Sequence, residues 1–230
     1  MPPLKLKNMR FLYSTIILLF LLPLIASGQR KKDHYLFHFG LRSVDVRSDN
    51  SPPTSFKPVV DIGFGINYQL SQNLQFQPEL RYTPRGYQSK SPLTDSTFLN
   101  NSLSLHYVDF CPNFNYTFGS TEHTFIHLSI WGGPYLGLGI VGKQTTSGTI
   151  LNTNKTRADS TVSRTNATFG NGLNRLDYGL NLGVGLQFER IAQLGISYSM
   201  GFNNVSTFQA SPIYNQSWGL YMRVLFDDMF

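Results

Sequence analysis

The chain has 230 residues and a formal net charge of +6, and charged and aromatic residues make up 14% each. Its one cysteine, Cys111, excludes an intramolecular disulfide and a cysteine-based zinc site. Because the positive charge is small and is not gathered in a cluster, the composition argues against a nucleic-acid partner.

The first 28 residues have the organisation of a secretory signal. Three basic residues precede an apolar run over 11–25, and small residues follow it just before Gln29. An anchoring helix is the alternative, but it needs about 20 apolar residues, and this run is shorter and contains Pro23. No cysteine follows the run directly, so a lipoprotein anchor is not available. We predict a cleaved signal over 1–28 and one mature domain over 29–230, whose formal charge falls to +3 when the three basic residues leave.

Eight segments of the mature domain alternate between apolar and polar residues with period two, which is the pattern of a β-strand with one apolar face. In chain order the predicted strands are about His34–Arg42, Val60–Leu70, Asn73–Thr83, Leu103–Phe118, Thr124–Val141, Leu176–Phe188, Gln193–Asn203 and Ser217–Phe226. The fourth changes phase near Tyr107 and Val108, which indicates a bulge. Prolines cannot donate to a ladder, so those inside predicted strands should lie at bulges or rims: Pro78, Pro112 and Pro134.

The sixth strand shows the pattern most clearly, with Leu182 on an apolar face and Gly183 on a polar one. It runs for about 13 residues, whereas ordinary strands have about 5–6 and a tilted membrane-crossing strand needs about 9–11. No mature segment approaches 18 consecutive apolar residues, and without helices only a closed barrel satisfies the backbone inside a bilayer. The pattern therefore predicts lipid on one face and a polar lumen on the other.

Short and long connections alternate between these strands. The turns at 71–72, 119–123 and 190–192 are short, and the long polar connections are 43–59, 84–102, 142–175 and 204–216. Outer-membrane barrels have short periplasmic turns and longer extracellular loops. The expected fold is all-β, an eight-stranded antiparallel up-and-down transmembrane β-barrel in the outer membrane of a Gram-negative bacterium. The segment 142–175 is expected to be disordered, to be the most exposed part of the chain and to provide the contact with a protein partner.

The polar face should fill the lumen of so narrow a barrel with paired charges. The predicted lumen network consists of Asp61, Glu79, Arg81, Asp109, Asp177 and Glu189, with Arg223 as a further cation. A catalytic carboxylate–histidine site is the alternative, for which Asp109, His106 and His127 are the one plausible grouping. No nucleophile elbow, zinc-protease, P-loop or EF-hand motif occurs in the sequence. We therefore predict no catalytic residue, no metal and no cofactor.

Two further patterns concern family and assembly. The stretch Tyr107-Val108-Asp109-Phe110-Cys111-Pro112, followed by Gly133-Pro134-Tyr135-Leu136-Gly137-Leu138, resembles the PorT-like outer-membrane β-barrel domain of Bacteroidetes. In that family the proline follows one residue earlier, and Cys111 is the departure. The resemblance implies a Bacteroidetes outer membrane and, through the founding member, a secretion-associated role. The last strand resembles a signal read by the barrel-assembly machinery, carried by Ser217, Gly219, Met222, Val224 and Phe230.

Together these patterns predict a small barrel with outer-membrane lipid as its surroundings and a structural, secretion-associated or surface-interaction role, but no channel activity. An outer-membrane enzyme that hydrolyses lipid or peptide is the first alternative. A soluble lipocalin-like carrier is the second, and it would turn its apolar faces inward.

Overall fold

The computed structural model describes residues 34–48, 56–94, 97–119, 125–151, 158–189, 191–207 and 212–226. The predicted signal at 1–28 lies outside these residues. Ten strands form one sheet: β1 (His34–Arg47), β2 (Lys57–Gln69), β3 (Leu74–Thr94), β4 (Thr97–Thr117), β5 (Ile126–Leu151), β6 (Ala158–Phe169), β7 (Gly172–Leu173), β8 (Leu176–Phe188), β9 (Ala192–Gly201) and β10 (Tyr214–Phe226). Within the described part of the chain, no helix is long and apolar enough to cross a membrane.

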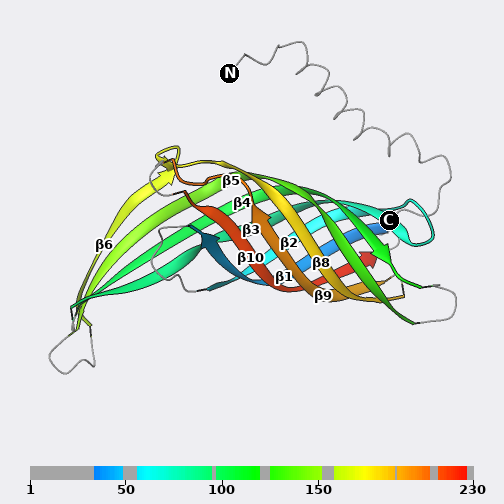
Figure 1. Ribbon diagram of the computed structural model, residues 1–230, viewed down its shortest axis with the longest axis horizontal. Coiled ribbons are helices and arrows are strands. Elements are labelled where there is room, and N and C mark those ends of the chain that lie inside the picture. Colours follow the sequence, from blue (N-terminus) through cyan, green and yellow to red (C-terminus); the bar gives the residue numbers. More distant parts are fainter. Residues whose placement is uncertain are drawn as a thin grey trace, which may run out of the picture. The chain divides into compact units, whose positions relative to one another are not determined.

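Eight of the strands close into a ring, as predicted. Each of β1, β2, β3, β4, β5, β8, β9 and β10 pairs antiparallel with both neighbours, and β1 closes the ring against β10. Figure 1 shows these strands winding around a common axis in the unit that begins at His34. The strand that the sequence showed most clearly, Leu176–Phe188, has the predicted bounds.

The outer face of the ring is apolar and its inner face is polar. Leu182 is 55% exposed and Phe64 66% exposed on the outside, whereas Asp61 and Asp177 are completely buried inside. A soluble lipocalin-like carrier requires the opposite arrangement, so that alternative is wrong. An apolar outer face is the arrangement expected of strands in contact with hydrocarbon.

Two of the predicted long loops are strands instead. β3 and β4 stay paired up to Thr94 and Thr97, and β5 continues to Leu151 and returns as β6. We call these continuations beyond the ring the wing, which comprises residues 88–94, 97–102, 143–151 and β6; Figure 1 shows it curving away from the barrel. The expectation of disorder over 142–175 is therefore wrong for β5 and β6, because backbone pairing between adjacent strands orders polar residues without an apolar face.

The predicted bulge occurs in the partner strand rather than in β4. His106 pairs with Val141 and Tyr107 with Gly139, so the extra residue is Ile140 on β5. The odd-numbered residues of β4 point inward without interruption from Leu103 to Thr117. The apparent change of phase arises because the inward residues near the long-loop end of β4 are themselves apolar.

The prolines also depart from expectation. Pro78 and Pro112 pair with each other inside the β3–β4 ladder, at the fifth pair from its short-turn end, and Pro134 pairs with Leu180. The β2–β3 and β4–β5 ladders each lack pairs beside Pro78 and Pro112, yet the register is the same on either side of the gap. Each proline therefore removes hydrogen bonds without adding a residue, because the neighbouring pairs hold the strands in place.

Candidate functional site

The barrel lumen holds the largest set of buried polar side chains in the described structure, arranged in layers along the barrel axis. The alternation that turns apolar residues outward turns every second residue of each ring strand inward. The barrel has two ends, the end of the short turns and the end of the long connections.

The middle layer is an ion-pair network centred on Glu79. Arg81 Nε and Arg223 Nη2 each lie 2.8 Å from one of its carboxylate oxygens. His38 Nδ1 lies 3.6 Å from Glu79, and His38 Nε2 lies 3.2 Å from Asp61 Oδ2. These side chains are at most 2% exposed. Several charges that would each be costly to bury alone thus have partners from four strands.

Trp131 provides an aromatic surface for the two arginines of this layer. The Arg223 Cζ lies 3.8 Å from the ring centroid and the Arg81 Cζ 5.3 Å from it. A cation over an aromatic face is stabilised most when both are desolvated, as they are here. Trp131 lies opposite Gly183, where a Cβ would come within 2.2 Å of the indole Nε1. The glycine therefore makes room for the indole.

A second charged cluster lies closer to the end of the long connections, around Arg85. Its guanidinium donates to Asp109 and, over 3.1 Å, to Asp177 Oδ2. Asn215 Nδ2 also donates to Asp177 over 2.7 Å. The Arg85 Cζ lies 4.5 Å from the ring centroid of Tyr135. This cluster joins β3, β4, β5, β8 and β10 across the lumen.

The two outer layers differ in chemistry. Toward the short turns the inward side chains are amides and hydroxyls that bind one another, among them Asn67, Gln75, Gln77, Asn115, Thr117, Gln187 and Gln193. Toward the long connections the lumen is closed by an apolar cluster of Val46, Tyr87, Leu103, Leu105, Tyr107, Leu173, Val205 and Ile213. The lumen was predicted to be polar throughout, so this apolar cluster is a departure from the prediction.

The structure places five of the six predicted lumen residues in these layers: Asp61, Glu79 and Arg81 in the middle network, and Asp109 and Asp177 around Arg85. The prediction for Glu189 is wrong. Glu189 is exposed in the turn after β8, with a φ of 48°. It follows the last residue of the strand, where the alternation that would turn it inward no longer applies.

Four further lumen residues were not among those predicted: His38, Arg42, Arg85 and Trp131. His38 and Arg42 could have been found, because they share the face of β1 opposite the predicted apolar residues. Arg42 donates to Ser199, Ser217 and Ser197 over 3.0–3.2 Å and so links β1 to β9 and β10. Arg85 was missed because it fell in a predicted loop.

The candidate catalytic grouping of Asp109, His106 and His127 does not form. Asp109 faces the lumen, but His106 is on the outer face, where its Nδ1 lies 2.6 Å from the hydroxyl of Tyr82. His127 is buried near the short turns, ten residues along β5 from Gly137, the residue that pairs with Asp109. Among the described residues, no group of three or more His, Cys, Asp or Glu side chains could hold a metal ion.

The residues of the predicted assembly signal divide between the two faces of β10. Ser217 and Gly219 point inward, and a Cβ on Gly219 would lie 2.2 Å from the carbonyl oxygen of Leu41. Met222 and Val224 point outward, and Phe230 lies outside the described residues. Gly219 thus permits the close approach of β10 to β1 where the ring closes.

A closed ring with an apolar outer face and a charged interior defines an outer-membrane β-barrel protein. The chain belongs to the outer membrane protein beta-barrel domain family, which it matches over residues 27–207. It is therefore a small barrel protein of the outer membrane. The comparison with curated proteins finds no match.

Several solved structures have a similar course of the chain. Ail, the attachment invasion locus protein of Yersinia pestis, is 10% identical and has a TM-score of 0.39, with 85% of this chain and 100% of that chain covered. Neisserial surface protein A is 12% identical with a TM-score of 0.44, covering 83% and 96%. The outer membrane enzyme PagL is 14% identical with a TM-score of 0.34, covering 84% and 98%.

Proposed function

We propose that this protein is a non-conducting, non-enzymatic outer-membrane barrel that displays the wing at the cell surface for contact with a protein partner. The observation that carries the proposal is the continuation of β3, β4, β5 and β6 as a paired sheet beyond the ring. Long connections of outer-membrane barrels face the outside of the cell. Binding commonly resides on such segments when a rigid scaffold positions them.

The edges of the wing suit pairing with an extended segment of another protein. Among the described residues, β2 pairs with β3 only as far as Tyr82, and β6 meets β7 only at Thr168 and Phe169. Strand edges offer backbone donors and acceptors in a row, and a partner strand can add to them. Their polar composition limits aggregation while it leaves this backbone recognition available.

The filled lumen supports the absence of conduction. The network around Glu79 crosses the middle of the barrel, and the apolar cluster covers the end of the long connections. The separation of His106 from Asp109 supports a non-enzymatic role. A secretion-associated role is the more specific form of the proposal, supported by the resemblance of the Gly133-Pro134-Tyr135 segment to PorT-like barrels of Bacteroidetes.

Site-specific photo-crosslinking on intact cells tests the proposed role. A photoreactive residue at the exposed wing position Gln88 should give one discrete protein adduct, and the same residue at lipid-facing Leu220 should give none. The Gln88 adduct should be lost when residues 144–167 are replaced by a short turn. Absence of an adduct at Gln88 and at the other exposed wing positions, in a barrel that still folds, would contradict the proposal.

A further inference from the structure

An apolar groove crosses the lipid-facing wall of the barrel. It is lined mainly by outward-facing side chains of β4, β5, β8, β9 and β10, including Phe114, Ile130, Leu182, Ile196, Tyr198 and Trp218. Its volume is about 730 Å³, within the range of pockets that bind small molecules. The groove passes over Gly132, which has no side chain to fill it. A lipid-facing wall that is concave here can hold a hydrocarbon chain along its length.

The groove has two distinct ends. One end lies beside Leu74, the first residue of β3 next to a short turn. The other reaches Trp218, whose ring meets Phe56 edge to face at 6.1 Å just before β2 begins. Tyr198 borders the same end. Tyrosine and tryptophan mark the interfacial girdle of barrels, so this end of the groove points toward the lipid headgroups.

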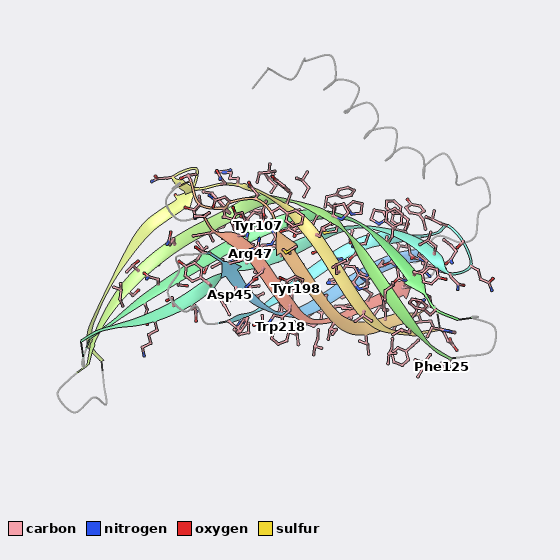
Figure 2. All side chains as sticks on the ribbon, in the orientation of Figure 1. Asp45, Arg47, Tyr107, Phe125, Tyr198 and Trp218 are labelled. Carbon is pink, nitrogen blue, oxygen red and sulfur yellow. The ribbon has the colours of Figure 1, made fainter. Side chains whose placement is uncertain are left out.

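A cation lies directly beyond that end. Arg47 is exposed at the last position of β1, and its guanidinium reaches across β10, with its Cζ 5.3 Å from the ring centroid of Tyr214. Its Nη1 lies 3.5 Å from the sulfur of Met200, the next outward residue after Tyr198 on β9. Figure 2 labels Arg47, Tyr198 and Trp218 on the barrel.

No carboxylate of the described residues forms an ion pair with Arg47. Asp45 is the acidic side chain nearest to it along β1, but Asp45 is only 9% exposed, and its Oδ1 accepts a hydrogen bond from Val46 N over 2.8 Å. Apart from the Nη1 contact with the Met200 sulfur, the planar guanidinium of Arg47 therefore keeps its donors available among the described residues. Such a group matches the geometry of a phosphate oxygen pair.

We propose that this surface is a binding site for one phosphate-bearing membrane lipid. An acyl chain lies in the groove over Gly132, and the phosphate of the headgroup accepts hydrogen bonds from Arg47. The outward position of the groove makes hydrocarbon its natural occupant, since the wall faces the bilayer. The cation at the headgroup level selects among lipids by charge. The site is independent of the wing, so either proposal can fail without the other.

Native mass spectrometry of the full-length protein in mild detergent tests this site. The probes are dioleoyl phosphatidic acid and dioleoylglycerol, which share their acyl chains and differ in the phosphate. The unaltered protein should retain phosphatidic acid about tenfold better, the effect of one hydrogen bond to a charged group. Inorganic phosphate alone should not bind, because it has no chain for the groove.

Two matched pairs of variants separate the chain from the headgroup. Arg47→Gln should lose the preference for phosphatidic acid, whereas Arg175→Gln, at another exposed arginine, should keep it. Ile196→Trp fills the groove and should weaken both lipids, whereas Leu220→Trp, on the lipid face outside the groove, should weaken neither. Heat-modifiable migration confirms that each variant is folded. The proposal is overturned if folded Arg47→Gln keeps the preference, or if folded Ile196→Trp binds as Leu220→Trp does.

Discussion

At the scale of single residues, the stability of the charged lumen depends on how its charges are paired and not only on their presence. Glu79 holds Arg81 and Arg223 together through separate oxygens. A buried ion pair is costly to break on one side only, because the remaining charge stays in the interior without a partner. The central carboxylate of this network should therefore be more sensitive to substitution than any exposed acid.

Glu79→Gln tests that expectation. It should lower the free energy of unfolding by about 3–5 kcal/mol, the usual cost of removing one partner of a buried ion pair. Glu189→Gln changes the same functional group on the surface and should cost less than about 0.5 kcal/mol. Urea unfolding in lipid vesicles, followed by tryptophan fluorescence, measures both. Equal destabilisation by the two changes would contradict the central role of Glu79.

Leu182→Arg tests which face meets lipid. Leu182 pairs with Gly132 midway along the β5–β8 ladder, whereas Leu138 lies at its last pair, and both side chains point outward. Arginine should cost about 2–4 kcal/mol at Leu182 and about 0–1 kcal/mol at Leu138, because the penalty falls toward the interface. The same unfolding measurement distinguishes the two, and similar costs would refute the assigned depth.

Gly183→Ala should destabilise the barrel from the inside, by about 1–3 kcal/mol, because its Cβ would meet the Trp131 indole. Gly148→Ala is the matched control, since a Cβ there meets nothing within 4 Å. Combining Gly183→Ala with Trp131→Leu should cost less than the sum of the two single changes, as expected for residues in contact. Strict additivity would show that the indole does not limit the space.

At the scale of the elements, strands differ in what holds them in place. The strands of the ring have one face buried in the lumen and the other face in contact with lipid. The wing continues the same ladders from Gln88↔Ser102 to Thr94↔Thr97 and from Lys143↔Thr168 to Leu151↔Ala158. Its stability therefore rests more on pairing between strands and less on a buried apolar face. We expect the wing to open more readily than the ring.

Trypsin added to intact cells should consequently cut at Lys155 or Arg157, between β5 and β6, and leave the ring intact. The fragments, identified by mass spectrometry, should stay associated in mild detergent, because β4, β5 and β8 still pair within the ring. Arg81 and Arg223 are internal controls, since both are buried and should resist. Cleavage between β5 and β6 only after the outer membrane has been permeabilised would place the wing in the periplasm.

At the scale of the whole molecule, closure and filling act together. An eight-stranded ring is just wide enough for its own side chains to fill. Here the fill consists of an amide layer, two charged clusters and an apolar cluster in succession. Each layer draws residues from several strands, so the barrel interior is cross-linked around its circumference.

The purified protein should therefore give no stable conductance in planar lipid bilayers. It should migrate faster on gels before heating than after, because the closed ring resists detergent until it is heated. A stable, large conductance from protein that shows this shift would contradict the filled lumen. Absence of the shift in protein refolded from urea would mean only that refolding had failed, so membrane-extracted protein is the sample to use.

The sequence by itself determined where the lipid-facing strands lie. One face of each such strand meets lipid and the other meets the polar lumen, so apolar and polar residues alternate along it, and this alternation is visible locally in the sequence. Leu182 and Gly183, which are adjacent in the sequence, show the alternation: the first faces lipid and the second faces the lumen. The antiparallel pairing of β1 with β10 follows from the even number of such strands. The lengths of β3 to β6 were decided by the tertiary structure. A strand that does not meet lipid needs no apolar face, so the Ser, Thr and Asn residues of the wing show no alternation between apolar and polar residues from which a strand could be predicted.

The partners of the lumen residues were likewise decided only by the tertiary structure. Glu79 meets Arg223 across 144 positions of sequence because the ring brings β3 and β10 to face each other. The Leu103 and Leu105 side chains close the lumen because residues from distant parts of the chain cover them there, namely Val46, Tyr87, Leu173, Val205 and Ile213. A local sequence pattern predicts whether a side chain points inward or outward, but it does not predict which side chain lies opposite it across the barrel. That depends on the register and tilt of all eight strands, which are properties of the closed ring as a whole.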